Sequence, residues 1–149
     1  MRNYYEVLEI LKTTLEADPL VTTITNEDTE SIDLNKKNLY PIVDMVCTGA
    51  TIGTQTITFN MLITAVDIRE HNNVPSTSKF VGNDNKQDNL NTTLAILNRL
   101  FKTIAALGDE FTIIGEPTPE PVVFDFANQL DGWQMTLVVE TPNTEISIC

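Results

Sequence analysis

Apolar residues recur along this chain at two different spacings, and each spacing predicts one kind of element. A spacing of three to four residues is typical of an amphipathic helix packed on a core. It predicts a first helix from Asn3 to Ala17, ended by Asp18-Pro19 because proline disfavours helix in the residue before it. It also predicts a longer helix over Leu90–Leu107, with Gly108 as its stop. The expected core faces are Tyr4, Val7, Leu8, Leu11 and Leu15 in the first helix and Leu90, Leu94, Leu97, Phe101 and Ile104 in the second.

Strict alternation of apolar and polar residues is clearest from Thr56 to Ala65. A period of two predicts a strand with one face on the core and one polar face. The alternation slips near Leu62 and Val66, which indicates a bulge or a second contact on the outer face. The preceding stretch, Pro41–Ile52, predicts the partner strand, and Gly53-Thr54 predicts the tight turn of a long hairpin.

The remaining apolar stretches are shorter or are interrupted by proline. Leu20–Thr25 predicts a short strand, and Ile32–Leu34 a weak extended piece. Phe111–Phe126 contains three prolines, which indicates an edge strand or an extended connection. The last strand is expected over Leu130–Val139, ended by Pro142.

The order of these elements predicts an α+β fold. We expect a mainly antiparallel sheet with a long hairpin, packed by an N-terminal helix and a long central helix. With 149 residues, 42% of them hydrophobic, one domain over 1–149 can bury a core. Flexible loops are expected at about 26–39 and 69–87, because polar stretches of this length are rarely structured in compact domains.

Acidic residues dominate the charge of the chain. Nine lysines and arginines face 21 aspartates and glutamates, for a net charge of -12. No lysine or arginine follows Lys102. Such a surface repels free nucleic acid, which argues against conventional DNA binding, and solubility is the simplest reason for it.

The polar stretch around Asp84 to Asp88 invites comparison with a calcium loop. Counted from Asp84, the third position is Lys86, the sixth is Asn89 and the twelfth is Ala95. An EF-hand loop needs oxygen ligands, glycine and glutamate at these positions, so a metal site is excluded. We expect instead that Asp84 or Asp88 caps the N-terminus of the long helix.

Residues with catalytic potential are isolated. His71, the only histidine, lies in a polar loop, and we expect it to be solvated. Cys47 is expected in the core and Cys149 as a loose end, which leaves no zinc ligand set and no disulfide framework, as in an intracellular protein. Asp109-Glu110 is expected in a solvated turn and Trp133 in the core. We therefore predict no catalytic residue, cofactor or metal, and we expect no signal peptide and no membrane span.

Four stretches of the chain resemble one group of phage proteins. They are GNDNKQDNLNTTLAILNRLF (Gly82–Phe101), LYPIVDMVCTGATI (Leu39–Ile52), FANQLDGWQMTLVVETPN (Phe126–Asn143) and the ending TEISIC. Together they are similar to the small tail-completion or tail-terminator-like proteins of tailed bacteriophages, over nearly the whole chain and in the same order. The group has no catalytic signature to compare.

The resemblance implies a non-enzymatic virion protein that forms a homo-oligomeric ring at the head–tail junction or tail end. A tail terminator implies a hexamer, and a neck adaptor a dodecamer. Its partners would be other phage tail or neck proteins, and DNA would pass through the channel without specific binding. The subunit would be assembled into the virion in the host cytoplasm, with no membrane involved.

The resemblance also suggests where subunits meet. It places contacts in the Arg69–Gln87 loop and in the long hairpin. The interface residues expected in that loop are Arg69, Glu70, Lys79, Phe80 and Val81. The alternative is a small acidic inhibitor or immunity-type protein that binds a basic partner by charge complementarity.

Overall fold

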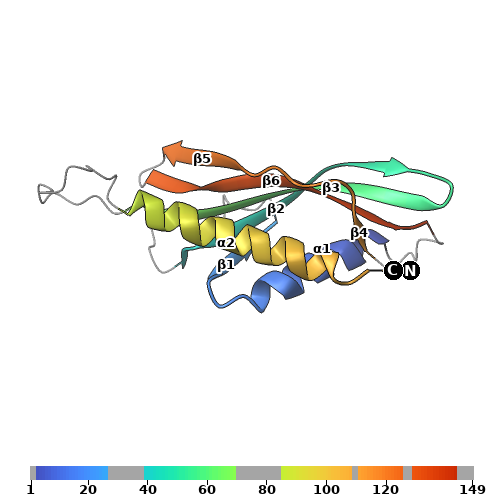
Figure 1. Ribbon diagram of the computed structural model, residues 1–149, viewed down its shortest axis with the longest axis horizontal. Helices are drawn as coiled ribbons and strands as arrows, with labels where there is room; N and C mark the ends of the chain where they lie inside the picture. Colours follow the sequence, from blue (N-terminus) through green and yellow to red (C-terminus); the bar gives the residue numbers. More distant parts are fainter. Residues whose placement is uncertain (1–2, 27–38, 70–84, 109–110, 126–128, 144–149) are drawn as a thin grey trace, which may run out of the picture.

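The computed structural model describes residues 3–26, 39–69, 85–108, 111–125 and 129–143. Within these ranges the chain forms two helices and a six-stranded sheet. The elements, shown in Figure 1, are α1 (Asn3–Glu16), β1 (Thr23–Thr25), β2 (Ile42–Ile52), β3 (Thr56–Ile68), α2 (Lys86–Ala105), β4 (Thr112–Ile113), β5 (Glu120–Asp125) and β6 (Gln129–Pro142). The predicted α+β class is confirmed.

The sheet is built on three long antiparallel strands. Its order is β1-β2-β3-β6-β4, and β5 also pairs with β6. Only β1 and β2 run parallel among the described strands. The strands β5 and β4 share one edge of β6, because β5 pairs with Gln129–Gln134 and β4 with Val139 and Glu140. The prediction of an edge strand or an extended connection after α2 is therefore confirmed: β4 and β5 are edge strands, and residues 114–119 connect them.

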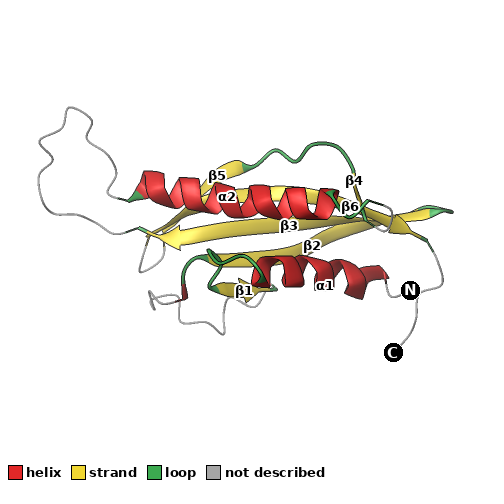
Figure 2. Ribbon diagram, turned by 60° about the horizontal axis from the view of Figure 1, so that its bottom comes forward, coloured by secondary structure: helices red, strands yellow, loops and turns green. Residues whose placement is uncertain are grey.

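Both helices pack on one face of the sheet, as Figure 2 shows, and the other face carries no helix in the described part of the chain. The alternation predicted for β3 is confirmed, since every second residue from Ile57 to Ala65 is buried beneath the helices. In α1, Val7, Leu11 and Leu15 are fully buried, and Leu8 is partly buried. Tyr4, which was also expected in the core face, is 39% exposed at the start of the helix, against the ring of Phe59.

A smaller apolar cluster lies on the face that the helices leave open. Val66 is buried there together with Ile68 and Leu130. The predicted second contact on the outer face is therefore confirmed for Val66. The irregularity of pairing lies in the neighbouring strand, where the register of β2 shifts between Cys47 and Gly49.

The face that α2 buries differs from the predicted stripe. Its buried residues are Asn89, Thr93, Ile96, Leu97, Leu100 and Ile104. Leu97 and Ile104 are common to both sets, whereas Leu94 is 38% exposed and Phe101 only partly buried. The prediction was wrong for Leu94, and it missed Asn89 and Thr93 because it counted apolar residues alone. Asn89 and Thr93 can be buried because their polar groups are hydrogen-bonded, to the carbonyls of Ile68 (3.0 Å) and Asn89 (2.7 Å).

The boundaries of the elements also required corrections. The helix α2 begins at Lys86 rather than Leu90 and ends at Ala105, before Gly108, whose φ of 71° suits a glycine stop. Its N-cap residue is Asn85, without a side-chain cap bond, so Asp88 is not the cap. Asp88 does lie in the first turn, where its charge suits the positive end of the helix, as expected. Asp84 lies outside the described residues.

The first helix ends at Glu16, one residue earlier than predicted, and β1 is shorter than the predicted strand over Leu20–Thr25. Leu20 instead donates its backbone N–H to Asp18 Oδ1 at 3.0 Å, in the turn that follows α1. The extended piece expected at Ile32–Leu34 lies outside the described residues, as does most of both expected loops.

Candidate interaction surfaces

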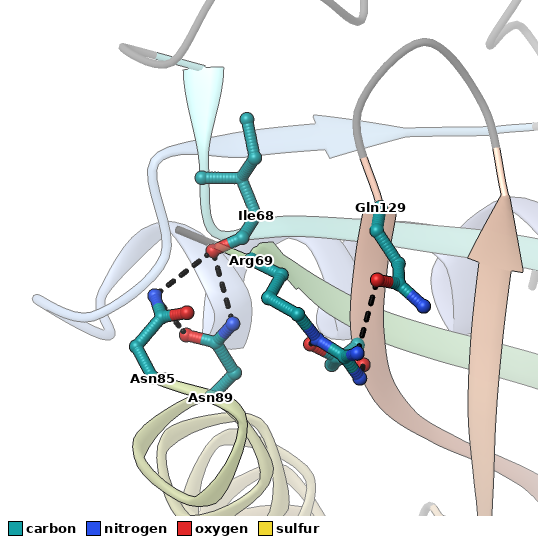
Figure 3. A network of polar contacts seen from close by, with 6 residues as sticks. Ile68, Arg69, Asn85, Asn89 and Gln129 are labelled. Atoms are coloured by element: carbon teal, nitrogen blue, oxygen red, sulfur yellow. Dashed lines mark hydrogen bonds and ion pairs between the residues drawn. The ribbon is translucent and has the colours of Figure 1, made fainter. Parts of the chain in front are cut away.

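A buried ion pair joins the end of β3 to the start of β6 (Figure 3). The guanidinium of Arg69 donates from Nε to Asp131 Oδ2 at 2.7 Å and from a second nitrogen to Oδ1. A third bond runs from Nη1 to Gln129 Oε1 at 3.0 Å. The Asp131 side chain is fully buried and that of Arg69 is 12% exposed. This forked geometry neutralises the buried carboxylate.

Two asparagines fasten the first turn of α2 to the same place. Asn85 and Asn89 each donate from Nδ2 to the backbone carbonyl of Ile68, at 3.1 and 3.0 Å. Figure 3 shows both amides pointing at that oxygen. Further along the helix, Trp133 Nε1 donates to the carbonyl of Leu90 at 2.9 Å. The two ends of segment 70–84 are thus held close together, by Arg69 on one side and Asn85 on the other.

This network holds structure together and offers no reactive group. Each charge in it has a partner, and the surrounding amides are hydrogen-bonded within the chain. Arg69 was expected at a subunit contact, but its guanidinium binds Asp131 within the same chain. The sequence did not indicate this pairing. Glu70, Lys79, Phe80 and Val81 lie outside the described residues, so the contact expected there stays a prediction.

The other residues singled out for chemistry are placed only in part. His71, Asp109-Glu110 and Cys149 lie outside the described residues. Cys47 is a free thiol packed at the margin of the core, with Sγ 3.5 Å from the carbonyl oxygen of Gly49. Trp133 also packs against the core from a half-buried position.

The β2–β3 hairpin is a more promising surface. Between Asp44 and Asp67 it contains no charged residue, although the chain carries a net charge of -12. Since β1 pairs only with Ile42–Asp44, the edge of β2 from Met45 to Ile52 has no neighbouring strand among the described residues. Natural proteins protect such edges with charges, prolines or bulges. Here only the bulge after Cys47 is present, so the hairpin has the composition of a contact surface.

An open groove runs between α2 and the connection from β4 to β5. Its volume is about 550 Å³, and its lining includes Leu94, an apolar residue that is 38% exposed. A single charged residue, Glu116, lines it. The full lining is Asn91, Leu94, Ala95, Leu97, Asn98, Phe101, Glu116, Pro117, Pro119 and Met135.

A second hollow of similar size, about 590 Å³, lies beside α1. Its lining includes Tyr5, which is 63% exposed, and three charged residues, Glu6, Glu9 and Lys12. The two hollows therefore differ mainly in charge. An uncharged surface would lose little hydration energy by entering the first, whereas entering the second would strip water from ionised groups.

Neither a metal cluster nor a membrane-spanning helix is found in the described ranges. No three His, Cys, Asp or Glu side chains there are grouped so that they could hold an ion. Neither α1 nor α2 is both long and apolar enough to cross a bilayer. The chain matches no protein-family model and no curated protein sequence.

Proposed function

We propose that this chain is a non-enzymatic structural subunit of a tailed bacteriophage, which assembles as a ring at the head–tail junction or tail end. The observation that carries the proposal is the uncharged hairpin, whose β2 edge from Met45 to Ile52 has no neighbouring strand in the part of the chain that the structure describes. The similarity of the four sequence stretches to tail-completion proteins supplies the biological setting.

The charge distribution supports self-association through this hairpin. Two copies with a net charge of -12 repel each other wherever acidic surfaces meet. Like charges placed directly across an interface cost several kcal/mol. A contact between copies is therefore least unfavourable where charge is absent, and the exposed end of the hairpin, Ala50–Gln55, is such a surface.

The helix-free face of the sheet supports a channel for DNA. No described strand contains a lysine or arginine. Asp44 and Glu140 pair with Thr64 and Thr58 of β3, which alternate with the buried residues and so point away from the helices. The described strands thus offer this face carboxylates and hydroxyls but no lysine or arginine, which repels phosphate, so DNA could slide past it without binding.

Oligomeric state is the direct test of this proposal. Mass photometry over a range of protein concentrations, followed by negative-stain microscopy, should show rings. We expect six subunits for a tail terminator or twelve for a neck adaptor. A protein that stays monomeric at every concentration and with candidate tail or neck proteins present would refute it.

The acidic balance favours a second candidate, an inhibitor or immunity-type protein for a basic partner. The complete lack of lysine and arginine after Lys102 is the observation behind it. Charge complementarity would steer such a partner and raise its rate of association. A monomer that binds a basic protein tightly, with an association rate that falls steeply as salt is added, would favour this candidate over the ring.

A further inference from the structure

We propose that the tip of the β2–β3 hairpin of one copy inserts into the α2 groove of the next copy. This inference rests on the proposed ring and names the contact that closes it. A ring needs a head-to-tail contact, in which two different surfaces of each subunit meet. On this acidic chain the hairpin and the α2 groove are two separate surfaces that carry little charge.

The hairpin tip, Ile52–Gln55, projects as an uncharged knob that carries one large apolar side chain. Ile52 is 79% exposed, the most exposed large hydrophobic residue of the described chain. Figure 1 shows the hairpin reaching past the ends of both helices. A lone monomer gains nothing from an isoleucine held in water at this position, whereas a neighbouring copy that buries it gains its transfer free energy.

The tip is also held rigid by the end of β6. The turn is closed by the N–H of Gly53, which donates to the carbonyl of Thr56 at 2.8 Å. Asn143 then clamps the turn from outside, through Nδ2 to the carbonyl of Gly53 at 2.6 Å and through its N–H to the carbonyl of Gln55 at 2.8 Å. A knob fixed before binding loses little conformational entropy on docking.

The α2 groove matches this knob in chemistry. Leu94, Phe101 and the prolines 117 and 119 supply apolar walls, and the volume of about 550 Å³ has room for an isoleucine with the turn residues beside it. Asn91 and Asn98 stand exposed on the helix side of the groove. Their amides can donate to and accept from the backbone groups of the β2 edge, which pairs with no other described strand beyond Asp44.

The hollow beside α1 is a poorer receptor although it is slightly larger, about 590 against about 550 Å³. Glu6, Glu9 and Lys12 line it, and the knob has no charge with which to compensate their lost hydration. Charge, rather than size, therefore selects the α2 groove.

A pair of complementary variants tests the contact. Ile52→Asp disables the knob and leaves the groove intact, while Leu94→Asp disables the groove and leaves the knob intact. Each alone should weaken ring formation by about ten- to a hundredfold, the equivalent of one buried aliphatic side chain. Val123→Asp places the same charge on β5, where the wild-type residue is 46% exposed and lies on neither surface, and should leave rings unchanged. Asn98→Glu, at an exposed position of the groove lining, provides a second groove variant outside the core.

Mixing the two disabled variants gives the decisive result. The intact knob of the Leu94→Asp chain can enter the intact groove of the Ile52→Asp chain. The groove of the first chain and the knob of the second are both disabled, so no further copy can bind. Native mass spectrometry should therefore show one-to-one heterodimers that do not grow, formed by neither variant alone. Circular dichroism spectra like that of the wild type confirm that each variant is folded.

Failure of this contact can be distinguished from failure of the proposed function. If the Ile52→Asp and Leu94→Asp variants both form rings as readily as the wild type, the knob-and-groove contact is overturned and the proposed ring is not. Loss of rings in both variants without heterodimers on mixing would overturn it as well. Wild-type protein that forms no ring would refute the ring itself, and heterodimers from the mixed variants would then still establish the contact, as part of an open chain.

Discussion

Replacing Arg69 by methionine tests the network at the base of segment 70–84. Methionine keeps much of the length and apolar character of the arginine stem but removes the guanidinium. The Asp131 carboxylate, which is fully buried, then loses its charged partner. No other arginine or lysine is among the residues bonded to it in the described chain.

The size of the effect follows from that burial. Removing one partner of a buried ion pair costs about 3–5 kcal/mol, because the other charge is left uncompensated. For a chain near 150 residues, each kcal/mol lowers the melting temperature by roughly 2–4 °C. We therefore expect Arg69→Met to melt roughly 6–20 °C below the wild type.

The chain provides a matched control in Arg99. Its pair with Asp18 spans 3.4 Å between Nη1 and Oδ1, but the Arg99 side chain is 48% exposed. The Asp18 side chain is 7% exposed, but it also accepts the N–H of Leu20, and the guanidinium that faces it is open to water. Pairs screened by water contribute at most about 1 kcal/mol, so Arg99→Met should lower the free energy of unfolding only slightly. Urea denaturation of both variants measures the difference in their free energies of unfolding. The dependence of that free energy on urea concentration should be compared as well, because a changed slope would indicate a changed unfolded state.

A double variant separates the buried charge from lost packing. The double variant Arg69→Met, Asp131→Leu removes both charges of this ion pair. Much of the stability lost in Arg69→Met should therefore return. If Arg69→Met costs no more than Arg99→Met, water or a rearranged side chain compensates Asp131, and the reasoning from burial is refuted.

Three further predictions concern the core and the sheet, all measured as the free energy of unfolding in urea. Leu97→Ala should cost about 2–5 kcal/mol because the side chain is fully buried, whereas Leu94→Ala, 38% exposed, should cost about 1 kcal/mol or less. Gly132→Ala should cost about 1–3 kcal/mol or more, since its Cβ would lie 1.8 Å from a backbone oxygen of β3, while Gly49→Ala, with 3.8 Å to its nearest neighbour, should be close to neutral. Thr141→Val should be neutral or stabilising, because the buried hydroxyl has no hydrogen-bond partner among the described residues.

Each of these predictions has an outcome that contradicts it. Equal losses for Leu94→Ala and Leu97→Ala would restore the stripe inferred from apolar spacing. A neutral Gly132→Ala would mean that β3 and β6 separate easily at this point. A clear loss of stability in Thr141→Val would reveal a hydrogen bond to a residue outside the described ranges.

The surfaces that carry the proposals were visible in the sequence to different degrees. The hairpin could be predicted from its alternation and its turn, and its lack of charge can be read directly from the chain. The groove could not be found this way, because its walls come from α2, from the prolines after β4 and from Met135 of β6. Their proximity depends on how the helix lies across the sheet.

The sequence by itself determined the alternating face of β3 and the positions of most elements. These are local properties, because a period of two or of 3.6 arises from backbone geometry over neighbouring residues. Every second residue from Ile57 to Ala65 is buried as this period requires. The absence of positive charge from the strands likewise needs no structure to be seen.

Only the tertiary structure decided which face α2 buries and what Arg69 does. Burial of Asn89 depends on the carbonyl of Ile68, and the charge of Arg69 is matched by Asp131, a residue far away in the sequence. A polar side chain can be buried when a partner satisfies it, and that partner can come from any part of the chain. Hydrophobic periodicity contains no information about such distant partners, so the predicted stripe of α2 included the exposed Leu94 and left out the buried Asn89 and Thr93.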